Sequence, residues 1–329
     1  MPNWPFTHGI HDIGNGTYGY VQPDGTWGWS NAGLIASEGQ TLLVDTLMSV
    51  PLTRTMLDDF RARVPAAARI QRLVNTHANP DHFFGNGLVA DAEIISTEEA
   101  KLEMGEFDPR ALAALKDNYA QMGDAGAFLY ETMGRKFDFS GVDALTLPNR
   151  TFEGRLDLTV GSKQVQLIDL GPAHTRSDTI VWIPGDRVLF TGDLLFNEGH
   201  PIMWAGPIEN WIAACQHIID LAPEVVVPGH GPITDLTAVR NLKAYFEYIR
   251  KEARLRFEAG MDWSEAARDI SLREYRKWTD PERIVANVFA LYSQWGVAFT
   301  PEQRRDLFGA MGRYRTEVME YEGACDHVH

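Results

Sequence analysis

The sequence predicts an α/β protein in which mixed β-sheets are covered by helices and followed by a helical extension. Short apolar runs that end in turn residues recur through the first 230 residues and alternate with helical stretches. From about Asp235 onward these runs vanish, and helical patterns rich in Lys, Arg and Glu dominate. We therefore expect a main domain over residues 1–235 and a helical C-terminal extension over residues 236–329.

Strands are predicted where an apolar run meets a turn. These runs cover residues 41–45, 70–77, 164–171, 187–193 and 224–230. A hairpin is predicted around residues 156–170, because the alternating stretches LDLTV and QVQLI are joined by the turn sequence GSK.

Helices are predicted between the strands at residues 51–63 and 209–221, and in a longer segment from Pro109 to Lys136. We interpret the longer segment as a core helix pair, with a substrate lid as the alternative. Another helix is expected to begin after Pro281, because apolar residues there recur at intervals of four, three and four and so share one face. That stripe consists of Ile284, Val288, Leu291 and Trp295. We expect it to pack on the main domain, with a homodimer interface as the alternative.

Composition and charge favour a globular protein that acts on a small molecule over one that binds nucleic acid. At 329 residues and 44% hydrophobic content, the chain can bury a full core. Its formal net charge of −15 repels polyphosphates, and the sequence contains no evident basic patch, so no nucleic-acid partner is expected. A small, uncharged substrate is the better hypothesis.

Cysteine usage and the absence of targeting signals favour a cytoplasmic location. The two cysteines, Cys215 and Cys325, provide neither a disulfide framework nor a CxxC motif. The N-terminus lacks the pattern of a signal peptide, and no run of about 18 apolar residues predicts a membrane span. A tail site of Cys325, His327 and His329 is a further metal candidate, but we do not favour it because chain ends are usually frayed.

Three predicted strands run directly into side chains that bind metals. VNTH ends at His77, LFTGD at Asp193 and VVVPGH at His230. Ligands gather where buried strands open into loops at one edge of a sheet, since the strands fix their positions. Asp81 and His82 follow His77 closely, and His174 lies in the turn sequence GPAHTRSD. Imidazole and carboxylate donors suit zinc.

The order of these motifs is more specific than any single residue. HxxxDH, GxxHTxxD, TGD and PGHG resemble the metallo-β-lactamase superfamily, whose motifs are HxHxDH, GHT, GD and GH. The resemblance covers about residues 15–235. It implies a four-layered αββα sandwich with a metal site at one edge of its two sheets, and a metal-dependent hydrolase activity in the main domain.

Carried over by position, the resemblance implies one or two zinc ions per chain. His77 and His174 would hold a first metal, and Asp193 would bridge it to a second. The second metal would be held by Asp81, His82 and His230. One position departs from the family, because Asn79 replaces its second histidine and an amide oxygen is a poorer zinc ligand than imidazole. We therefore expect full occupancy of the second site only, with a two-metal site as the alternative; Asn79 could also form an outer hydrogen bond.

Aromatic residues near the motifs predict a pocket for a neutral, ring-containing substrate. Trp27 and Trp29 alternate along a predicted strand in GTWGWSNAG, and Trp204 follows the TGD loop. Phe83 lies beside the first motif, and Asn31 offers a polar contact. The alternative is that several of these side chains fill the core beneath the site.

The predicted chemistry is hydrolysis, because zinc lowers the pKa of bound water to about 7. Asp81 is expected to orient that water or take its proton, and His174 is either a ligand or a proton donor. The start WGWSNAG, Asn79 and the helical extension resemble the branch that holds the hydrolytic dehalogenase of a chlorinated aromatic dinitrile. A lactonase, an esterase or a polyketide cyclase would use much the same ligands. Outside the hydrolases, the alternatives are a metal-dependent redox enzyme and a catalytically silent metal-binding scaffold.

Overall fold

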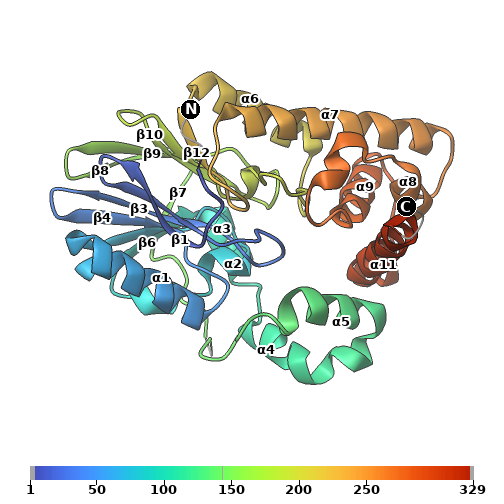
Figure 1. Cartoon of the computed structure of the whole chain (residues 1–329), viewed down its shortest axis with the longest axis horizontal. Coiled ribbons are helices and arrows are strands. Elements are labelled where there is room, and N and C mark those ends of the chain that lie inside the picture. Colours follow the sequence, from blue (N-terminus) through green and yellow to red (C-terminus); the bar gives the residue numbers. More distant parts are fainter. Residues whose placement is uncertain (1–3, 143, 327–329) are drawn as a thin grey trace.

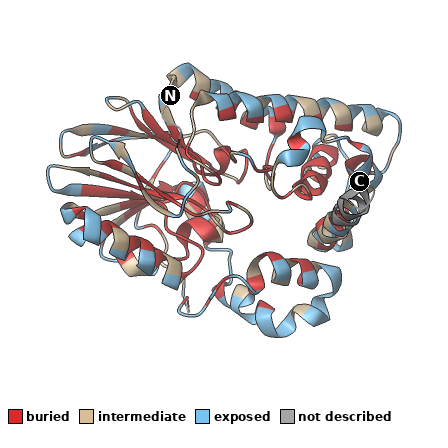
Figure 2. Cartoon of the chain, in the orientation of Figure 1, coloured by how far each residue is buried: buried red, intermediate tan, exposed pale blue. Residues whose placement is uncertain are grey.

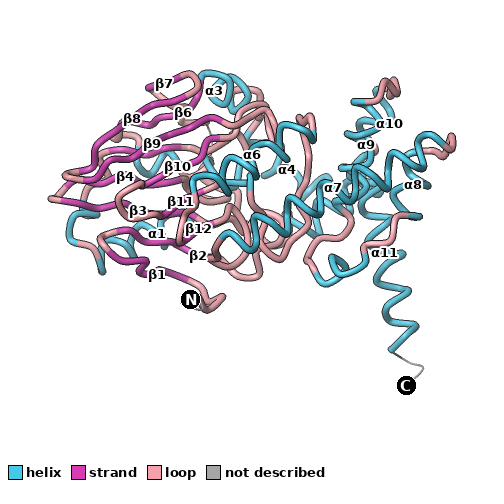
Figure 3. The backbone as a smooth tube through the Cα atoms, turned by 90° about the horizontal axis from the view of Figure 1, so that it is seen from above, coloured by secondary structure: helices cyan, strands magenta, loops and turns pink. Residues whose placement is uncertain are grey.

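Two β-sheets packed face to face form the main part of the chain, with helices on their outer faces (Figure 1). The computed structural model describes residues 4–142 and 144–326. His327 and His329 of the candidate tail site lie outside the described residues. Figure 3 shows the strands gathered at one end of the molecule and helices α7 to α11 at the other.

The first sheet has seven strands in the order β1-β2-β3-β4-β5-β6-β7. Its strands are β1 (Gly9–Gly14), β2 (Thr17–Val21), β3 (Ala32–Ser37), β4 (Gln40–Val44), β5 (Arg72–Val74), β6 (Glu93–Thr97) and β7 (Arg150–Phe152). The pairs from β1 to β4 are antiparallel, and those from β4 to β7 are parallel. The strand predicted at 70–77 is therefore short, because the chain leaves the sheet after Val74.

The second sheet has five strands in the order β12-β11-β10-β9-β8. Its strands are β8 (Arg155–Val160), β9 (Lys163–Asp169), β10 (Thr179–Ile183), β11 (Val188–Phe190) and β12 (Val225–Val227). Only the pair of β11 and β12 is parallel. The predicted hairpin is confirmed: Val160 pairs with Lys163 across a turn in which Gly161 has a positive φ of 56°.

Helices complete the four layers. On the first sheet lie α1 (Val50–Arg63), α2 (Pro80–Phe83) and α3 (Glu98–Met104), and on the second lie α6 (Ile208–Leu221) and the start of α7 (Leu236–Glu258). Ser49 caps α1 by accepting from the Leu52 backbone N–H, and Met56 and Phe60 of that helix pack on the sheet. Figure 2 shows the inner faces of these layers buried and the outer faces of α1 and α7 largely exposed. The αββα sandwich, and the helices predicted at 51–63 and 209–221, are confirmed.

The extension is helical, as predicted, and no strand occurs in its described part, up to Asp326. After α7 come α8 (Trp263–Asp269), α9 (Arg283–Gln294), α10 (Pro301–Arg305) and α11 (Leu307–Asp326). Ile284, Val288 and Leu291 of the predicted stripe are buried in a core that also contains Trp211 of α6, so the extension is packed on the main domain. The homodimer stays a prediction. Over the described residues, no helix is long and apolar enough to cross a membrane.

Two short helices lie beside the extension. The segment from Pro109 to Lys136, interpreted as a helix pair, contains α4 (Pro109–Asn118) and α5 (Gly123–Leu129). Gly123, the first residue of α5, has a positive φ of 62°, which prevents one continuous right-handed helix. Helix α5 packs along α11.

The predicted strand that carries Trp27 and Trp29 is wrong. Residues 22–31 form a loop between β2 and β3. Gly25 and Gly28, on either side of Trp27, have positive φ values of 76° and 74°, which turn the chain out of an extended conformation. The two indoles therefore do not alternate across a sheet.

Candidate metal centre

The predicted ligands follow strands of both sheets and meet at one edge of the sandwich. His77 follows β5, and Asp81 and His82 lie in the adjoining helix α2. Asp193 follows β11, and His230 follows the neighbouring parallel strand β12. His174 lies in the loop between β9 and β10. All six side chains are buried, so the fold brings together residues that are far apart in the sequence.

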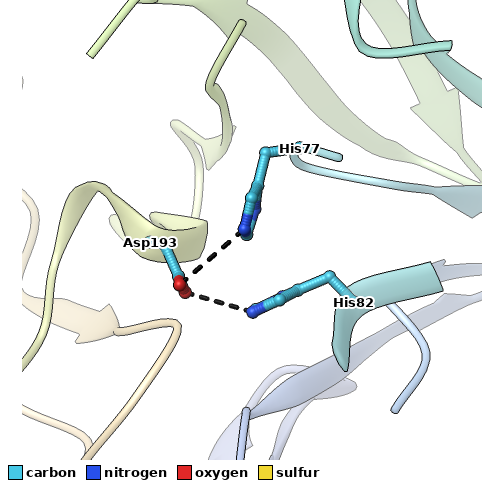
Figure 4. A group of neighbouring side chains, drawn as sticks. All are labelled: His77, His82 and Asp193. Carbon is cyan, nitrogen blue, oxygen red and sulfur yellow. Dashed lines mark ion pairs between the residues drawn. The ribbon is translucent and has the colours of Figure 1, made fainter. Parts of the chain in front are cut away.

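Asp193 lies at the middle of the cluster. Its Oδ1 is 3.1 Å from Nε2 of His82, and its Oδ2 is 3.7 Å from Nε2 of His77 (Figure 4). The same Oδ2 is 3.3 Å from Nε2 of His174 and 3.4 Å from Nε2 of His230. One carboxylate thus faces four imidazoles, which is the position that a bridging ligand requires.

Asp81 is a second carboxylate on one side of this centre. Its Oδ2 is 3.2 Å from Nε2 of His230 and 3.9 Å from Nε2 of His82. Two overlapping groups of donor atoms result, each with its atoms within 4.8 Å of one another. These groups are His77, His82 and Asp193, and Asp81, His82 and His230.

The outer nitrogens of the rings show that the donor set fits a metal. In all four rings Nδ1 lies beside an oxygen acceptor, so the proton sits on Nδ1 and the Nε2 lone pair faces inward. These pairs are His77 with Thr76 Oγ1 at 3.0 Å, His82 with Asp45 Oδ2 at 2.9 Å, His174 with Ile202 O at 2.6 Å and His230 with Gly25 O at 3.1 Å. In the described part of the chain, His77 Nε2, His82 Nε2 and Asp193 Oδ1 are buried without a hydrogen-bond partner. Such orphaned polar atoms are costly unless a ligand satisfies them.

Asp45, at the end of β4, is a site residue that sequence reasoning missed. Its carboxylate accepts from His82 Nδ1, and at 2.7 Å from both the backbone N–H and the hydroxyl of Thr76. A carboxylate behind a ligating histidine fixes the orientation of the ring and raises its basicity. The signal was present in TLLVD, an apolar strand that runs into a carboxylate as TGD does at Asp193.

The electrostatics divide the cluster into two halves. Burial lowers the pKa of His230, but Asp193 and Asp81 outweigh burial and raise that pKa to about 9. The His82 pKa is raised as well, because the nearby carboxylates overcome its burial. Burial lowers the pKa of His174 to about 4 and that of His77 below its ordinary value. The field of the carboxylates therefore favours positive charge beside His82 and His230.

Asn79 contacts His174, with its Nδ2 2.9 Å from Nε2 of the ring. Because Nδ1 of His174 faces the carbonyl oxygen of Ile202, Nδ1 carries the proton and Nε2 can only accept. The Asn79 amide therefore donates through its N–H, and the orientation of the amide is assigned from this network. The sequence-based alternative of an outer hydrogen bond through the Asn79 carbonyl is replaced by a bond from its nitrogen.

A cavity of about 490 Å³ opens on this cluster. Asp81, His174, Asp193 and His230 line it. The rest of its wall is mainly apolar and includes Trp27, Met48, Phe84, Phe107, Leu112, Phe196, Ile202 and Trp204. Its size is typical of a small-molecule site.

Two of the five predicted pocket residues, Trp27 and Trp204, line this cavity, and the other three are not among its lining residues. Trp29 packs on Phe137, with ring centroids 4.8 Å apart. Phe83 is buried in the core that also contains Phe84. The Asn31 side chain donates to backbone carbonyls of Pro228 and Gly231, and so holds the loop beneath His230. The differences at Trp29 and Asn31 arise because residues 22–31 form a loop and not a strand, whereas Phe83 lies at the end of α2 and packs into the core.

Other pocket residues come from segments that the sequence did not connect with the site. Leu129 and Met133 belong to the segment interpreted as a core helix pair, and they line the cavity as a lid would. Arg283 of α9 and Phe308 of α11 line it from the extension. The cavity is thus built by both parts of the chain.

The family model described as the metallo-beta-lactamase superfamily matches residues 25–230. The beta-lactamase-like protein 2 homolog of Caenorhabditis elegans is 31% identical over 83 residues, which are 25% of this chain and 27% of that protein. The 2,4-dinitroanisole O-demethylase subunit alpha of Nocardioides sp. (strain JS1661) is 23% identical over 205 residues, 60% of this chain and 51% of that protein. The chain spans about half or less of the length of these relatives.

Solved structures share the fold. The sec-alkylsulfatase Pisa1 from Pseudomonas sp. has a TM-score of 0.62 at 16% identity and covers 89% of this chain and 51% of its own. A metallo-beta-lactamase from Pontibacter korlensis has a TM-score of 0.54 at 18% identity and covers 72% of this chain and 98% of its own. The residues that the family model matches include every His and Asp side chain of the two donor groups. The chain belongs to the metallo-β-lactamase superfamily.

Proposed function

We propose that this protein is a zinc-dependent hydrolase that acts on a small, neutral, ring-containing substrate. The observation that carries the proposal is the position of the His and Asp cluster, which is buried on the wall of an apolar cavity of about 490 Å³. The relatives with the same fold include proteins named as metallo-beta-lactamases and a sec-alkylsulfatase, which supports hydrolysis.

The donor atoms favour one zinc ion in the second half of the centre. Asp81, His82 and His230 would hold it together with Asp193, since both carboxylates face these two rings. In the first half, the N–H of Asn79 already occupies the Nε2 lone pair of His174. A second ion that used His174 together with His77 would have to break that hydrogen bond and would gain no imidazole from position 79.

The chain's own groups can orient water and substrate at this site. Zinc, when bound, supplies a water whose pKa is lowered to about 7. Burial opposes ionisation of Asp81, but His82 and His230 outweigh it and lower the Asp81 pKa to about 2, so this carboxylate is ionised at neutral pH and can accept a hydrogen bond that orients the water. His174 is neutral, and its ring is fixed between Ile202 and Asn79. We propose that His174 positions the substrate beside Asp81 by contact with its ring, which lines the cavity, because both ring nitrogens are already hydrogen-bonded.

The cavity wall favours an uncharged substrate. Glu103 and Glu106 line it, and both are paired with Arg176, at 3.5 and 2.8 Å. The remaining wall offers aromatic faces, on which a ring can stack. One relative is named for O-demethylation of 2,4-dinitroanisole, an aromatic ether, which supports attack on an electron-poor ring or its substituent. Dehalogenation of a chlorinated aromatic and hydrolysis of a lactone or ester are alternatives, as is a polyketide cyclase.

Metal analysis followed by a substrate panel tests the proposal. The zinc-loaded protein is assayed with 4-nitroanisole, 4-nitrophenyl acetate, a γ-lactone and a chlorinated aromatic nitrile. We expect turnover of at least one compound that chelator abolishes and zinc restores. Turnover that survives in metal-free protein would exclude the proposed mechanism. Bound iron with oxygen uptake would favour a redox enzyme, and no tightly bound metal would favour a silent scaffold.

We further propose that residues 1–235 and 236–329 act as one catalytic unit, since the described part of the extension supplies a wall of the cavity through Arg283 and Phe308. A cytoplasmic location and a homodimer are expectations of the sequence that stay open to experiment.

A further inference from the structure

Arg283, at the start of α9, is the one Lys or Arg side chain among the described residues that line the metal cavity. It is only 2% exposed. Burying a guanidinium is costly unless its charge and its N–H groups are matched. The contacts of Arg283 therefore show whether its charge and its N–H groups are matched within the protein or leave a donor for a ligand.

The known contacts of Arg283 leave part of its donor set unused. Nη1 donates to the carbonyl oxygen of His200 at 2.9 Å. Nη2 lies 2.9 Å from Oδ2 of Asp280, yet that oxygen is not aligned to accept a hydrogen bond. Nε is buried and has no hydrogen-bond partner in the described part of the chain. A guanidinium offers five N–H donors, so an acceptor is missing.

The position of the guanidinium connects it to the metal centre. Its central carbon lies 4.4 Å from the centroid of the Trp27 ring and 5.1 Å from that of Phe196. The Phe196 ring in turn stacks on His230, with centroids 5.0 Å apart and an interplanar angle of 8°. Arg283 is therefore separated from a proposed metal ligand by one aromatic ring.

The charge beside Arg283 also limits the missing acceptor. Asp280 already balances the positive charge at 2.9 Å, so an acceptor of Arg283 need not be an anion. An uncharged oxygen, such as that of a nitro or carbonyl group, matches an unused N–H donor without adding a second buried charge. The Trp27 and Phe196 rings beside the guanidinium favour a planar group at this place.

We propose that Arg283 determines substrate specificity by binding an acceptor oxygen on a substituent of the substrate's ring. The inference rests on the proposed function, because it assumes that the cavity takes a ring-containing substrate. It extends that function by naming the substituent: an electron-withdrawing acceptor group such as nitro or carbonyl. The helical extension would then select the substrate that the metal centre of the main domain hydrolyses.

Binding of two matched probes tests this role. Nitrobenzene and isopropylbenzene have similar shapes, but only the nitro group accepts hydrogen bonds, and neither compound can be hydrolysed. Dissociation constants are measured by NMR titration of the zinc-loaded protein. The ratio of the two constants is compared between wild type, Asp280→Asn and the double variant Asp280→Asn with Arg283→Met, which removes the cation and its partner together and so leaves no unpaired buried charge.

We expect the preference for nitrobenzene to fall about tenfold or more in the double variant, as for a hydrogen bond from a charged donor. Asp280→Asn alone, which keeps Arg283, should retain the wild-type preference. An unchanged ratio in a folded, zinc-loaded double variant would overturn the proposal, and so would binding of neither probe to wild type. If the double variant does not fold, Arg283→Lys is tested in its place, because lysine keeps the charge but lacks the Nε–H. This variant should lower the preference for nitrobenzene over isopropylbenzene. An unchanged preference would overturn the proposal.

Failure of the proposed function gives a different result. A protein that does not hydrolyse the substrate panel but binds nitrobenzene through Arg283 would retain the pocket assignment and lose the reaction. Zinc-dependent turnover with no effect of Arg283 on binding would retain the reaction and lose this inference.

Discussion

The two halves of the metal centre share Asp193 but differ in how their nitrogen donors are used. In the half with His82 and His230, Nε2 of each ring faces two carboxylates, Asp81 and Asp193. In the half with His77 and His174, Asn79 donates to Nε2 of His174. The two pairs of histidines are equally buried, but they differ in how well their nitrogens can bind a cation.

The difference teaches that ligand type alone does not define a metal site. What counts is whether the lone pair is free and whether a carboxylate lies beside it. Asp81 contacts only the second half, and the raised pKa of His230, to about 9, reflects the attraction of Asp193 and Asp81 for positive charge. A divalent cation in that half would replace the proton.

The largest loss of bound zinc is expected from substitutions in the half of the centre that contains His82 and His230. His82→Ala and His230→Ala should each reduce bound zinc to near zero after dialysis and reduce turnover to background, because each removes an imidazole donor that faces two carboxylates. Metal analysis measures the zinc content, and circular dichroism checks the fold. His217→Ala, at an exposed position on α6, is the control and should retain zinc. Full zinc content in both site variants would show that the site is misplaced.

A substitution in the first half should add a metal ion. Wild type is expected to bind close to one zinc, and Asn79→His should raise the count toward two, because it exchanges an N–H donor for an imidazole beside His77 and His174. Asn79→Ala removes the amide without supplying a ligand and should stay near one. A wild-type count near two by metal analysis would mean that the first half binds zinc without a third imidazole.

Asp45, the carboxylate behind His82, should have a smaller effect on zinc binding than the ligands themselves. Asp45→Asn is expected to weaken zinc affinity about 10-fold to 100-fold, because the amide no longer fixes His82 as a donor of full basicity. Competition with a fluorescent chelator measures the affinity. Asp59, on α1, accepts a hydrogen bond from the Tyr20 hydroxyl and lies outside the metal site. Asp59→Asn is therefore a matched control and should leave the zinc affinity unchanged. Equal affinities for wild type and Asp45→Asn would remove Asp45 from the site.

The smallest effect on zinc is expected from His174. His174→Ala should keep close to one zinc per chain while turnover falls, since the ring is held by Asn79 and Ile202 and is proposed to act on substrate. Parallel zinc analysis and kinetics separate the two outcomes. Loss of zinc as complete as in His230→Ala would place His174 among the ligands of the occupied site, and the contrast between the halves would be wrong.

Much of the fold and of the cluster could be predicted from local sequence. The runs that became β4, β11 and β12 are apolar because both faces of these strands pack in the sandwich or against helices. Each ligand motif begins where such a run ends, as at His77 and Asp193. Because both signals are local, they could be recognised without knowing how the strands pair.

The tertiary structure decided what depends on contacts between distant segments. Asp45 became part of the site only because β4 pairs with β5 and places its carboxylate behind His82. The direction of the Asn79 amide follows from His174, which is 95 residues away.

The sequence by itself determined the strand ends, the metal-binding residue types and the helical nature of the extension, because side-chain chemistry and apolar periodicity are written in neighbouring residues. It did not determine the pocket. The stretch GTWGWSNAG is predicted to be a strand by its alternation, but glycines with positive φ turn residues 22–31 into a loop that directs Trp27, and not Trp29, into the cavity. Arg283 reaches the same cavity because the extension folds back on the main domain, a packing arrangement that no local pattern encodes.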